Sequence, residues 1–256
     1  MTVLPTDVHA GARGPARPPR TGLLERLAAL DWPRIEAELD ERGHATTGGP
    51  VLSAAECAEL VRGYEAQGAF RSRVVMARHG FGRGEYQYYA YPLPGPVAEL
   101  RAGLYPRLAT IAGRWDRALG GPGGYPPDHE AYLERCRRAG QNLPTPLLLK
   151  YGAGDYNCLH QDLYGELVFP LQVAFLLSAP RHDFTGGELV LTEQRPRMQS
   201  RVEVVALEQG EGAVFAVNQR PARGARGLYR VAMRHGVSRV RSGQRFTLGI
   251  IFHDAR

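Results

Sequence analysis

The pattern of apolar and polar positions changes character at about residue 146. From there to the C-terminus, short apolar runs alternate with turn residues, and the runs cover 147–151, 171–177, 188–192, 201–206, 213–217, 228–233 and 246–252. Seven or eight short strands with no helical pattern between them are typical of an antiparallel sandwich or jelly roll. We therefore predict a β-rich core over residues 146–256.

The first part of the chain has the spacing of amphipathic helices. Apolar residues recur at helical intervals over 23–41, 53–64, 97–119 and 128–138, with a break expected near Trp32-Pro33 and a stop or kink near Pro106. Ser53 and Glu56 have the spacing of a capping box, which marks a helix start. Between these helices, the alternation and glycines of 70–91 predict a β-hairpin. We expect residues 21–145 to pack on the sheet, so that 21–256 forms one domain.

Composition excludes several classes of protein. The chain has 256 residues, 43% of them hydrophobic, and no stretch approaches the roughly 18 apolar residues of a membrane-spanning helix. Residues 1–20 are rich in glycine, proline and arginine, lack the apolar segment of a secretory signal, and are predicted to be a disordered tail. The three cysteines form no C-x-x-C pair, which argues against a disulfide framework or a structural zinc site. A reducing cytoplasm fits best, and the oligomeric state stays open.

The net charge of +6 comes almost wholly from arginine, because Lys150 is the only lysine. Between residues 194 and 245 there are eleven arginines and only three acidic residues. A surface of this kind attracts polyanions such as nucleic acid. The number of arginines is explained equally well by a generally arginine-rich composition, with the side chains on a solvated surface and no ligand.

His160-Gln161-Asp162 is the first candidate for chemistry. In an extended chain, residues two apart share a face, so the imidazole of His160 and the carboxylate of Asp162 can point at one spot. His235, at the end of a later strand pattern, is available as a third ligand. Two imidazoles and a carboxylate bind Fe(II) and leave positions open for a 2-oxo acid and dioxygen. An H-x-D triplet alone is a weak signal, so the context has to support it.

Arg245 provides that context. It lies ten residues after His235 and begins the pattern Arg245-Phe-Thr247, in which alternation sends the guanidinium and the Thr247 hydroxyl to one face. A guanidinium is a fixed fork of donors that matches a carboxylate, and Thr247 can add a hydrogen bond. A metal triad followed by this clamp indicates a site for 2-oxoglutarate.

Other residues are available as ligands but lack a matching clamp, namely Asp155, His182, Asp183 and His253. His253-Asp254 lies at the very C-terminus, where we expect a capping or surface pair. Cys158 shares the alternating face of His160, and we expect a small buried thiol that fills space there. Gly186-Gly187 is expected to form a tight turn before a strand, because neither a lysine nor a helix follows it as in a phosphate loop.

These motifs resemble a known enzyme superfamily. The runs that are similar to the local signature of prolyl hydroxylases are Lys150-Tyr-Gly-Ala-Gly-Asp-Tyr-Asn-Cys-Leu-His-Gln-Asp162, Phe184-Thr-Gly-Gly-Glu-Leu189, Arg234-His-Gly-Val-Ser238 and Arg245. The stretch from about residue 147 to 254 thus looks like an Fe(II)/2-oxoglutarate-dependent oxygenase. Two runs resemble more closely a bacterial branch called Oxygenase-NA, namely His160-Gln-Asp-Leu-Tyr-Gly and Thr192-Glu-Gln-Arg-Pro-Arg-Met-Gln-Ser200. That branch has been proposed to modify nucleic acids, by analogy with AlkB-type dealkylases.

The resemblance implies a fold and cofactors. The fold is a double-stranded β-helix, a cupin-like jelly roll, with the N-terminal helical part packed on the sheet. The cofactors are Fe(II), 2-oxoglutarate and O2, with iron on His160, Asp162 and His235. Arg245 then holds the C5 carboxylate of 2-oxoglutarate.

Further residues follow from the same alignment. Tyr151 occupies the position of a tyrosine that lines the co-substrate pocket in prolyl hydroxylases, and Gln172 faces inward together with Ala174 and Leu176. The spacing between the distal histidine and the co-substrate arginine differs from that of AlkB-type enzymes, in which the arginine lies farther beyond the histidine. The interval from His235 to Arg245 is nearer that of the hydroxylases, which leaves the substrate open.

Substrate contacts are expected from two places. Gln194, Arg195 and Arg197 form a turn between strands, where a rigid scaffold can present them to a substrate, although solvated loop arginines explain them almost as well. Tyr86 belongs to a tyrosine cluster that can stack on bases or pack the hairpin.

Three functions remain after this reading. The first is oxidative demethylation or dealkylation of damaged bases in nucleic acid, a form of DNA repair in which the base is single-stranded or flipped out. The second is a protein (prolyl-type) or small-molecule hydroxylase with the same mechanism. The third is a cupin-like binding protein without turnover, against which the intact triad and Arg245 argue.

Overall fold

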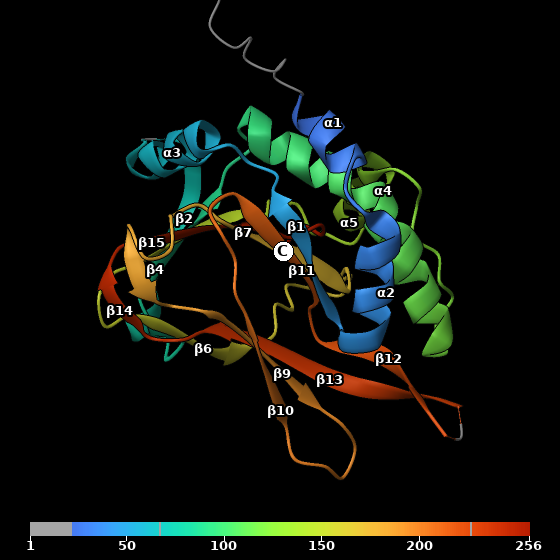
Figure 1. Ribbon diagram of the computed structural model, residues 1–256. Coiled ribbons are helices and arrows are strands. Elements are labelled where there is room, and N and C mark those ends of the chain that lie inside the picture. Colours follow the sequence, from blue (N-terminus) through green and yellow to red (C-terminus); the bar gives the residue numbers. More distant parts are fainter. Residues whose placement is uncertain (1–21, 67, 226) are drawn as a thin grey trace, which may run out of the picture.

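The computed structural model describes residues 22–66, 68–225 and 227–256 (Figure 1). The tail predicted over residues 1–20 therefore lies outside the described residues. The helices all precede residue 140, and they are α1 (Leu23–Ala28), α2 (Trp32–Arg42), α3 (Ala54–Arg62), α4 (Gly95–Ala118) and α5 (His129–Arg138), with short 3-10 turns η1 (Gly63–Glu65) and η2 (Met76–Arg78). Within the described residues, no helix has the length and apolar content that crossing a membrane requires.

The helix starts follow the local signals in the sequence. At the start of α3, the Glu56 amide donates to the Ser53 hydroxyl at 3.3 Å, and the Ser53 amide donates to the Glu56 carboxylate at 2.7 Å. Asp31 caps α2 through the Arg34 amide, and Pro33 occupies the first turn. The expected break therefore lies just before Trp32, and the proline lies in the first turn of the second helix, where it is tolerated.

The sequence predicts a stop or a kink at Pro106, and the stop does not occur, because α4 continues through this proline. Pro106 lies on the exposed side of the helix, so the backbone carbonyl that loses its donor can be hydrated. The opposite side carries Leu100, Leu104 and Leu108, which are all buried in the core. Packing of this apolar side outweighs the cost of one proline.

Fifteen strands make up the β part of the described chain. They are β1 (His44–Pro50), β2 (Phe70–Val75), β3 (Gly82–Arg83), β4 (Glu85–Tyr89), β5 (Leu147–Tyr151), β6 (Tyr156–His160), β7 (Leu171–Leu176), β8 (Phe184–Gly186), β9 (Leu189–Gln194), β10 (Arg201–Val205), β11 (Glu211–Ala216), β12 (Gln219–Gly224), β13 (Gly227–Val237), β14 (Val240–Gly243) and β15 (Arg245–Ile250). All seven strands predicted after residue 146 are present, and so is the hairpin, as the β2–β4 pair.

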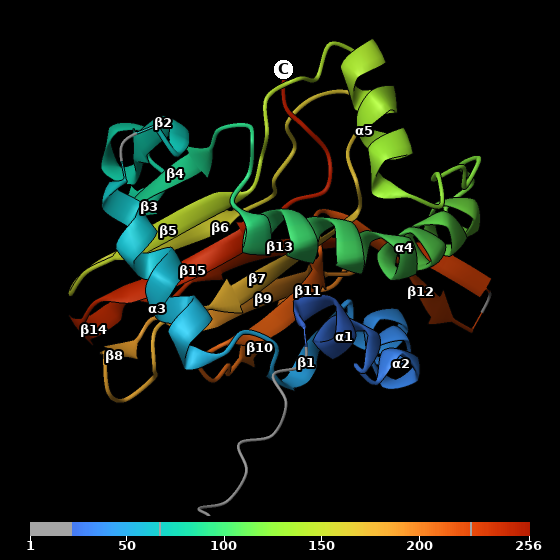
Figure 2. The ribbon, with the colours of Figure 1, turned by 90° about the horizontal axis from the view of Figure 1, so that it is seen from above.

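The strands form two facing sheets. The larger sheet has the order β1-β11-β7-β15-β5-β4-β2, and the smaller one has the order β10-β9-β13-β6-β3, with β12 paired to β13. A two-stranded β8–β14 ladder lies beside them. Helices cover the outer face of the larger sheet, where Figure 2 shows α3 and α4 crossing over its strands. This is the double-stranded β-helix with helices on one side that the sequence predicts.

The N-terminal part contributes more than helices to this architecture. Its strands form both edges of the larger sheet, with β1 at one edge and β4 and β2 at the other. Strands β1, β6, β8, β12 and β14 are not among the apolar runs that mark strands in the sequence. Strands β1 and β12 have polar, glycine- and proline-containing sequences, so no apolar alternation marks them.

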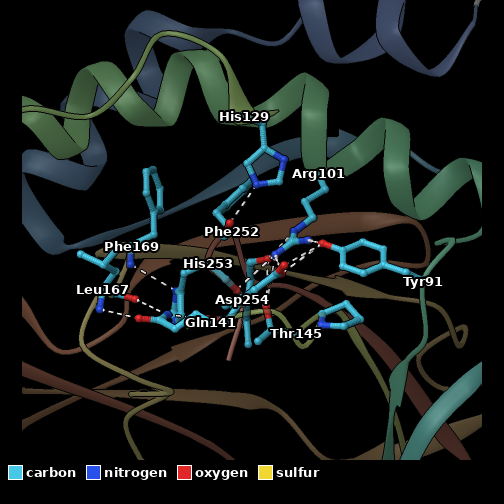
Figure 3. A network of polar contacts seen from close by, with 12 residues as sticks. Tyr91, Arg101, His129, Gln141, Thr145, Leu167, Phe169, Phe252, His253 and Asp254 are labelled. Carbon is cyan, nitrogen blue, oxygen red and sulfur yellow. Dashed lines mark hydrogen bonds and ion pairs between the residues drawn. The ribbon is translucent and has the colours of Figure 1, made fainter. Parts of the chain in front are cut away.

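The C-terminal residues His253 and Asp254 are buried, and the predicted surface pair is wrong. Asp254 is 1% exposed and lies 2.8 Å from the Arg101 guanidinium, which is also 1% exposed and comes from α4 (Figure 3). Tyr91 accepts a hydrogen bond from Arg101 and donates one to Asp254 at 2.9 Å. The network holds the chain end under α4, because a buried charge needs a partner and filled hydrogen bonds.

The same network holds the loop that follows Asp162. Gln141 donates to the carbonyl of Leu167 at 3.0 Å and accepts from its amide at 2.8 Å. The Phe169 amide donates to Nδ1 of His253 at 3.2 Å (Figure 3). The loop from Asp162 to β7 is therefore fixed to the body of the protein at its far end.

Candidate metal and co-substrate site

Three predicted ligands meet between the two sheets. His160 ends β6, Asp162 follows in the next loop, and His235 lies near the end of β13 directly opposite His160 in the β6–β13 ladder. The two imidazole rings have centroids 4.1 Å apart. One possible ligand atom from each residue lies within 4.8 Å of the others, which makes this a compact metal-binding group.

The orientations of the side chains suit a metal. Nδ1 of His160 lies 2.8 Å from the Cys158 carbonyl, so it carries the proton and leaves Nε2 with its lone pair. That Nε2 is 3.6 Å from Oδ1 of Asp162, and Nε2 of His235 is 3.2 Å from Oδ2. Two neutral imidazoles and a carboxylate on one side are the donor set of non-haem Fe(II) oxygenases.

Electrostatics keeps these donors in their metal-binding protonation states. Burial raises the pKa of Asp162, but the imidazoles of His235 and His160 outweigh it, and the net pKa lies well below the usual range. Burial, together with the neighbouring His235, lowers the pKa of His160. At neutral pH Asp162 is therefore ionised and His160 is neutral, as ligands must be.

Tyr164 is a residue that sequence reasoning missed. Its hydroxyl donates to Oδ1 of Asp162 at 2.5 Å, so one carboxylate oxygen is held by the protein while the other faces His235. The ring of Tyr164 packs edge-on against Tyr88 at 6.0 Å between centroids. The signal was present as a tyrosine two residues after the aspartate, but only the folded loop shows that it turns back.

Gln172 on β7 provides a test of fit for a metal. Its Nε2 lies 3.1 Å from Nε2 of His235, and its Oε1 is buried with no hydrogen-bond partner among the described residues. Buried polar atoms are normally satisfied, so an unsatisfied amide at this point indicates that a ligand belongs in the space. The residues therefore fit an Fe(II) with an organic co-substrate beside it.

Arg245 stands at the inner end of the site. It begins β15 opposite Tyr151 of β5, is 3% exposed, and donates from Nη1 to the Thr247 hydroxyl at 2.5 Å, so the two side chains share a face. Its guanidinium lies 5.7 Å from the centre of the Tyr151 ring and 5.9 Å from that of Phe184. Burial lowers the pKa of Arg245 to about 10, which still leaves it charged at neutral pH.

Among the described residues no carboxylate lies within ion-pair distance of Arg245, although Glu188 is near enough to raise its pKa, and the Arg245 Nε is buried without a hydrogen bond. A buried unpaired charge is costly, and the usual solution is an anionic ligand. Glycine is required next to this side chain, since a Cβ on Gly187, at φ +65°, would lie 2.9 Å from the Arg245 Cδ. The predicted turn at Gly186-Gly187 thus forms part of the wall behind the guanidinium.

A cavity of about 320 Å³ joins the triad to Arg245. Its wall includes the residues predicted to face the co-substrate, namely Tyr151, Gln172, Ala174, Arg245 and Thr247. Tyr86, predicted as a substrate contact, lines it too. Leu176 lies instead in the core between the sheets. Tyr88 and Tyr89, the neighbours of Tyr86, are buried, so the tyrosine cluster mainly packs the hairpin and only Tyr86 reaches the cavity.

The predicted loop of Gln194, Arg195 and Arg197 does not line this cavity. Arg195 donates to the carboxylate of Glu193 at 2.5 Å, and the other oxygen of Glu193 pairs with the buried Arg220. Figure 1 shows the loop between β9 and β10 projecting at the bottom of the view, beyond the smaller sheet to which both strands belong. Contacts from this loop can therefore reach only parts of a substrate that lie outside the cavity.

The remaining candidates are placed elsewhere. Cys158 is exposed at the cavity wall, so the prediction of a buried thiol is wrong. His182 and Asp183 form a surface pair at 2.8 Å. His253 is fully buried in the network under α4.

Comparison with known proteins decides the family. Residues 84–255 match the family Oxygenase-NA, described as "Oxygenase, catalysing oxidative methylation of damaged DNA". Two uncharacterized proteins of Mycobacterium tuberculosis, MT2286 of strain CDC 1551 / Oshkosh and Rv2227 of strain H37Rv, are each 46% identical over 195 residues. Each of these alignments covers 74% of this chain and 84% of the relative. The chain belongs to the Oxygenase-NA family.

Solved structures agree with this at the level of the fold. An oxidoreductase of the 2OG-Fe(II) oxygenase family from Burkholderia pseudomallei has a TM-score of 0.50 and 16% identity, and the match covers 93% of this chain and 95% of that one. A Trichoplax adhaerens prolyl hydroxylase, solved with a peptide of hypoxia inducible factor, has a TM-score of 0.51 and 14% identity over 91% and 92% of the chains. This Oxygenase-NA protein thus has the double-stranded β-helix fold of the Fe(II)/2-oxoglutarate oxygenases. As a member of this family it is an oxygenase.

Proposed function

We propose that this protein is a dioxygenase that acts on nucleic acid and removes alkyl groups from damaged bases by oxidation. The description of its family, which names damaged DNA as the substrate, supports the substrate class. The excess of arginine between residues 194 and 245 is compatible with it, because a basic surface attracts a polyanion.

The observation that carries the chemistry is the unpaired buried charge of Arg245 at the far end of the cavity that holds His160, Asp162 and His235. We assign the triad to iron and Arg245, with Thr247, to the C5 carboxylate of 2-oxoglutarate. Tyr151 and Gln172 then line the space between, where the co-substrate lies.

The protein's own residues position the reactants. Asp162 offers one oxygen because Tyr164 holds the other, and His160 offers Nε2 because the Cys158 carbonyl holds its Nδ1 proton. Arg245 would hold one end of the co-substrate at the opposite end of the cavity from the triad. When bound, Fe(II) with 2-oxoglutarate and dioxygen supplies the oxidation, in which one oxygen atom enters a substrate C–H bond and the other enters succinate as CO2 leaves.

The product follows from the chemistry of the substrate. Hydroxylation of an alkyl carbon attached to a ring nitrogen yields a hemiaminal, which releases the carbon as an aldehyde and restores the N–H of the base. A base inside a duplex has to be flipped out to enter the cavity, or the strand has to be single.

A second candidate is hydroxylation of a protein or small molecule by the same chemistry. The interval of ten residues between His235 and Arg245, which is similar to that of prolyl hydroxylases, favours it. The two candidates share the triad and the clamp, so only the substrate separates them.

One experiment tests the function directly. The iron-loaded protein is incubated with 2-oxoglutarate and with N-alkylated oligonucleotides, proline-containing peptides or free metabolites, while succinate and product mass are followed. We expect substrate-dependent succinate and loss of the alkyl mass with the oligonucleotides alone. Turnover restricted to a peptide or metabolite would reject the nucleic-acid proposal and leave the oxygenase chemistry in place.

The loop from Gln194 to Arg201 provides a separate test of the substrate contacts. Binding of a single strand should weaken with salt, with a log–log slope of about −0.7 for each phosphate contacted. Arg197→Ala should reduce that slope by about one such unit, and Arg195→Ala by less, because Glu193 already compensates Arg195. Arg107→Ala, on the exposed side of α4, is the control and should leave the slope unchanged.

A further inference from the structure

The mouth of the cavity carries an apolar patch that the site described above does not use. Phe81 is 48% exposed, and Leu159 and Leu163, which adjoin the ligands His160 and Asp162, are each 47% exposed. Phe81 and Leu159 both belong to the wall of the cavity that contains the triad. Large exposed apolar side chains gathered beside a catalytic cavity mark a surface that a substrate covers.

The backbone holds Phe81 firmly in this place. Its amide donates to the Met76 carbonyl at 3.2 Å, and its carbonyl accepts from the Cys158 amide at 2.9 Å, two residues before His160. Gly82 allows this approach, because a Cβ there would lie 2.4 Å from the Tyr156 carbonyl oxygen and its φ is +127°. The backbone of Phe81 is therefore held next to the strand that carries His160, while its ring stays half exposed.

The surroundings of Phe81 favour a nucleic acid. The ring stacks on His79 with centroids 5.3 Å apart and planes at 23°. Residues 76–84 contain Arg78, His79 and Arg83 and no acidic residue. Arg78 is exposed, and Arg83 has only a long contact of 3.8 Å to Asp155. An exposed aromatic ring on a segment whose charged side chains are all basic has the two features that bind single strands, stacking for bases and positive charge for phosphates.

We propose that Phe81 is a stacking platform for a base of the substrate strand at the mouth of the cavity, with Arg78 and Arg83 beside the backbone phosphates. This assignment rests on the proposed nucleic-acid function and places the strand at the η2–β3 segment. The loop of Gln194–Arg201, which lies outside the cavity wall, then contacts at most a distant part of the strand.

The test measures binding of a fluorescently labelled oligothymidylate to the full-length protein. Phe81→Ala and Phe81→Leu should each raise the dissociation constant by about tenfold. Both remove the aromatic ring, and stacking of one base on a ring contributes at least about a factor of ten to the affinity. Phe81→Trp should keep the affinity of the original protein, and its indole fluorescence should fall when the strand binds. Leu228→Ala is the matched control, since Leu228 is 54% exposed on β13 but outside the cavity wall, and its affinity should not change.

The outcomes separate this inference from the function on which it rests. Thermal unfolding confirms that each variant is folded, and Phe81→Ala should unfold at the original temperature because the ring is half exposed. If the original protein and Phe81→Ala bind the oligonucleotide with equal affinity, Phe81 is not a stacking platform, and the nucleic-acid function is unaffected. No binding of any oligonucleotide by the unchanged protein, with turnover on a proline-containing peptide, would overturn both.

Discussion

The hydroxyl of Tyr164 donates a hydrogen bond of 2.5 Å to Oδ1 of Asp162. This contact leaves only Oδ2 of the carboxylate free to face Nε2 of His235. A partner that orients a metal-binding carboxylate in this way determines both its direction and its basicity.

Tyr164→Phe should therefore weaken iron binding by about 10- to 100-fold without unfolding the protein. The 2-oxoglutarate clamp should remain, because Arg245 lies at the other end of the cavity. Anaerobic titration with Fe(II) measures the change. Tyr229→Phe, on the β12–β13 hairpin, is the control, and equal iron affinity in Tyr164→Phe would show that the hydroxyl does not position the ligand.

His160→Ala or Asp162→Ala should abolish substrate-coupled formation of succinate while far-ultraviolet circular dichroism stays unchanged. The ligands lie between two sheets whose strands are held together by backbone pairing and by the apolar core, so the fold should not depend on them. Asp162→Glu should also be inactive, because the extra methylene moves the carboxylate away from its position opposite His235. His182→Ala is a matched control, since His182 also adjoins an aspartate but lies on the surface. Full turnover in Asp162→Ala with iron present would reject the triad.

Arg245→Ala should raise the dissociation constant for 2-oxoglutarate by two to three orders of magnitude. Removing one member of a buried charge pair costs about 3–5 kcal/mol, and about 1.4 kcal/mol corresponds to a factor of ten. The dissociation constant of Arg245→Lys should lie between those of the original protein and Arg245→Ala, because lysine keeps the charge and loses the two-donor fork. Calorimetric titration with Mn(II) in place of iron gives the dissociation constants of the metal and of 2-oxoglutarate. The affinity for the metal should not change. An unaltered affinity for 2-oxoglutarate in Arg245→Ala would assign the clamp to another arginine.

The stability of the protein should fall as the pH is lowered below about 6.5. Burial lowers the pKa of His253 to about 4 and that of His129 to about 3, so both imidazoles are neutral in the folded state. In the unfolded chain each binds a proton near pH 6.5, and stability decreases wherever the unfolded state binds more protons. Between pH 7 and 5 each histidine should remove about 2 kcal/mol from the free energy of unfolding.

Urea unfolding at a series of pH values measures this loss. His253→Gln should reduce the slope between pH 6.5 and 5, because the amide takes up no proton. His182→Gln should leave the slope unchanged, since that imidazole is on the surface. A slope in His253→Gln equal to that of the original protein would mean that other groups cause the loss.

The sequence by itself determined the features that depend on a few neighbouring residues. The capping box of Ser53 and Glu56, the strands after residue 146, and the shared face of Arg245 and Thr247 all follow from the periodicity of helices and strands. The shared face of His160 and Asp162 likewise follows from the two-residue period of an extended chain. Family-like motifs then connected these local patterns to a metal and a co-substrate.

Only the tertiary structure decided which polar residues became part of the interior. Arg101 and Asp254 are 153 positions apart and look like surface residues, yet they form one buried pair. Tyr164 turns back onto Asp162 because its loop is held from afar by Gln141 and His253. Strand β1 has a polar sequence and forms because its backbone pairs with β11. Such features depend on the burial and pairing that distant segments provide, and no periodicity in the chain records them.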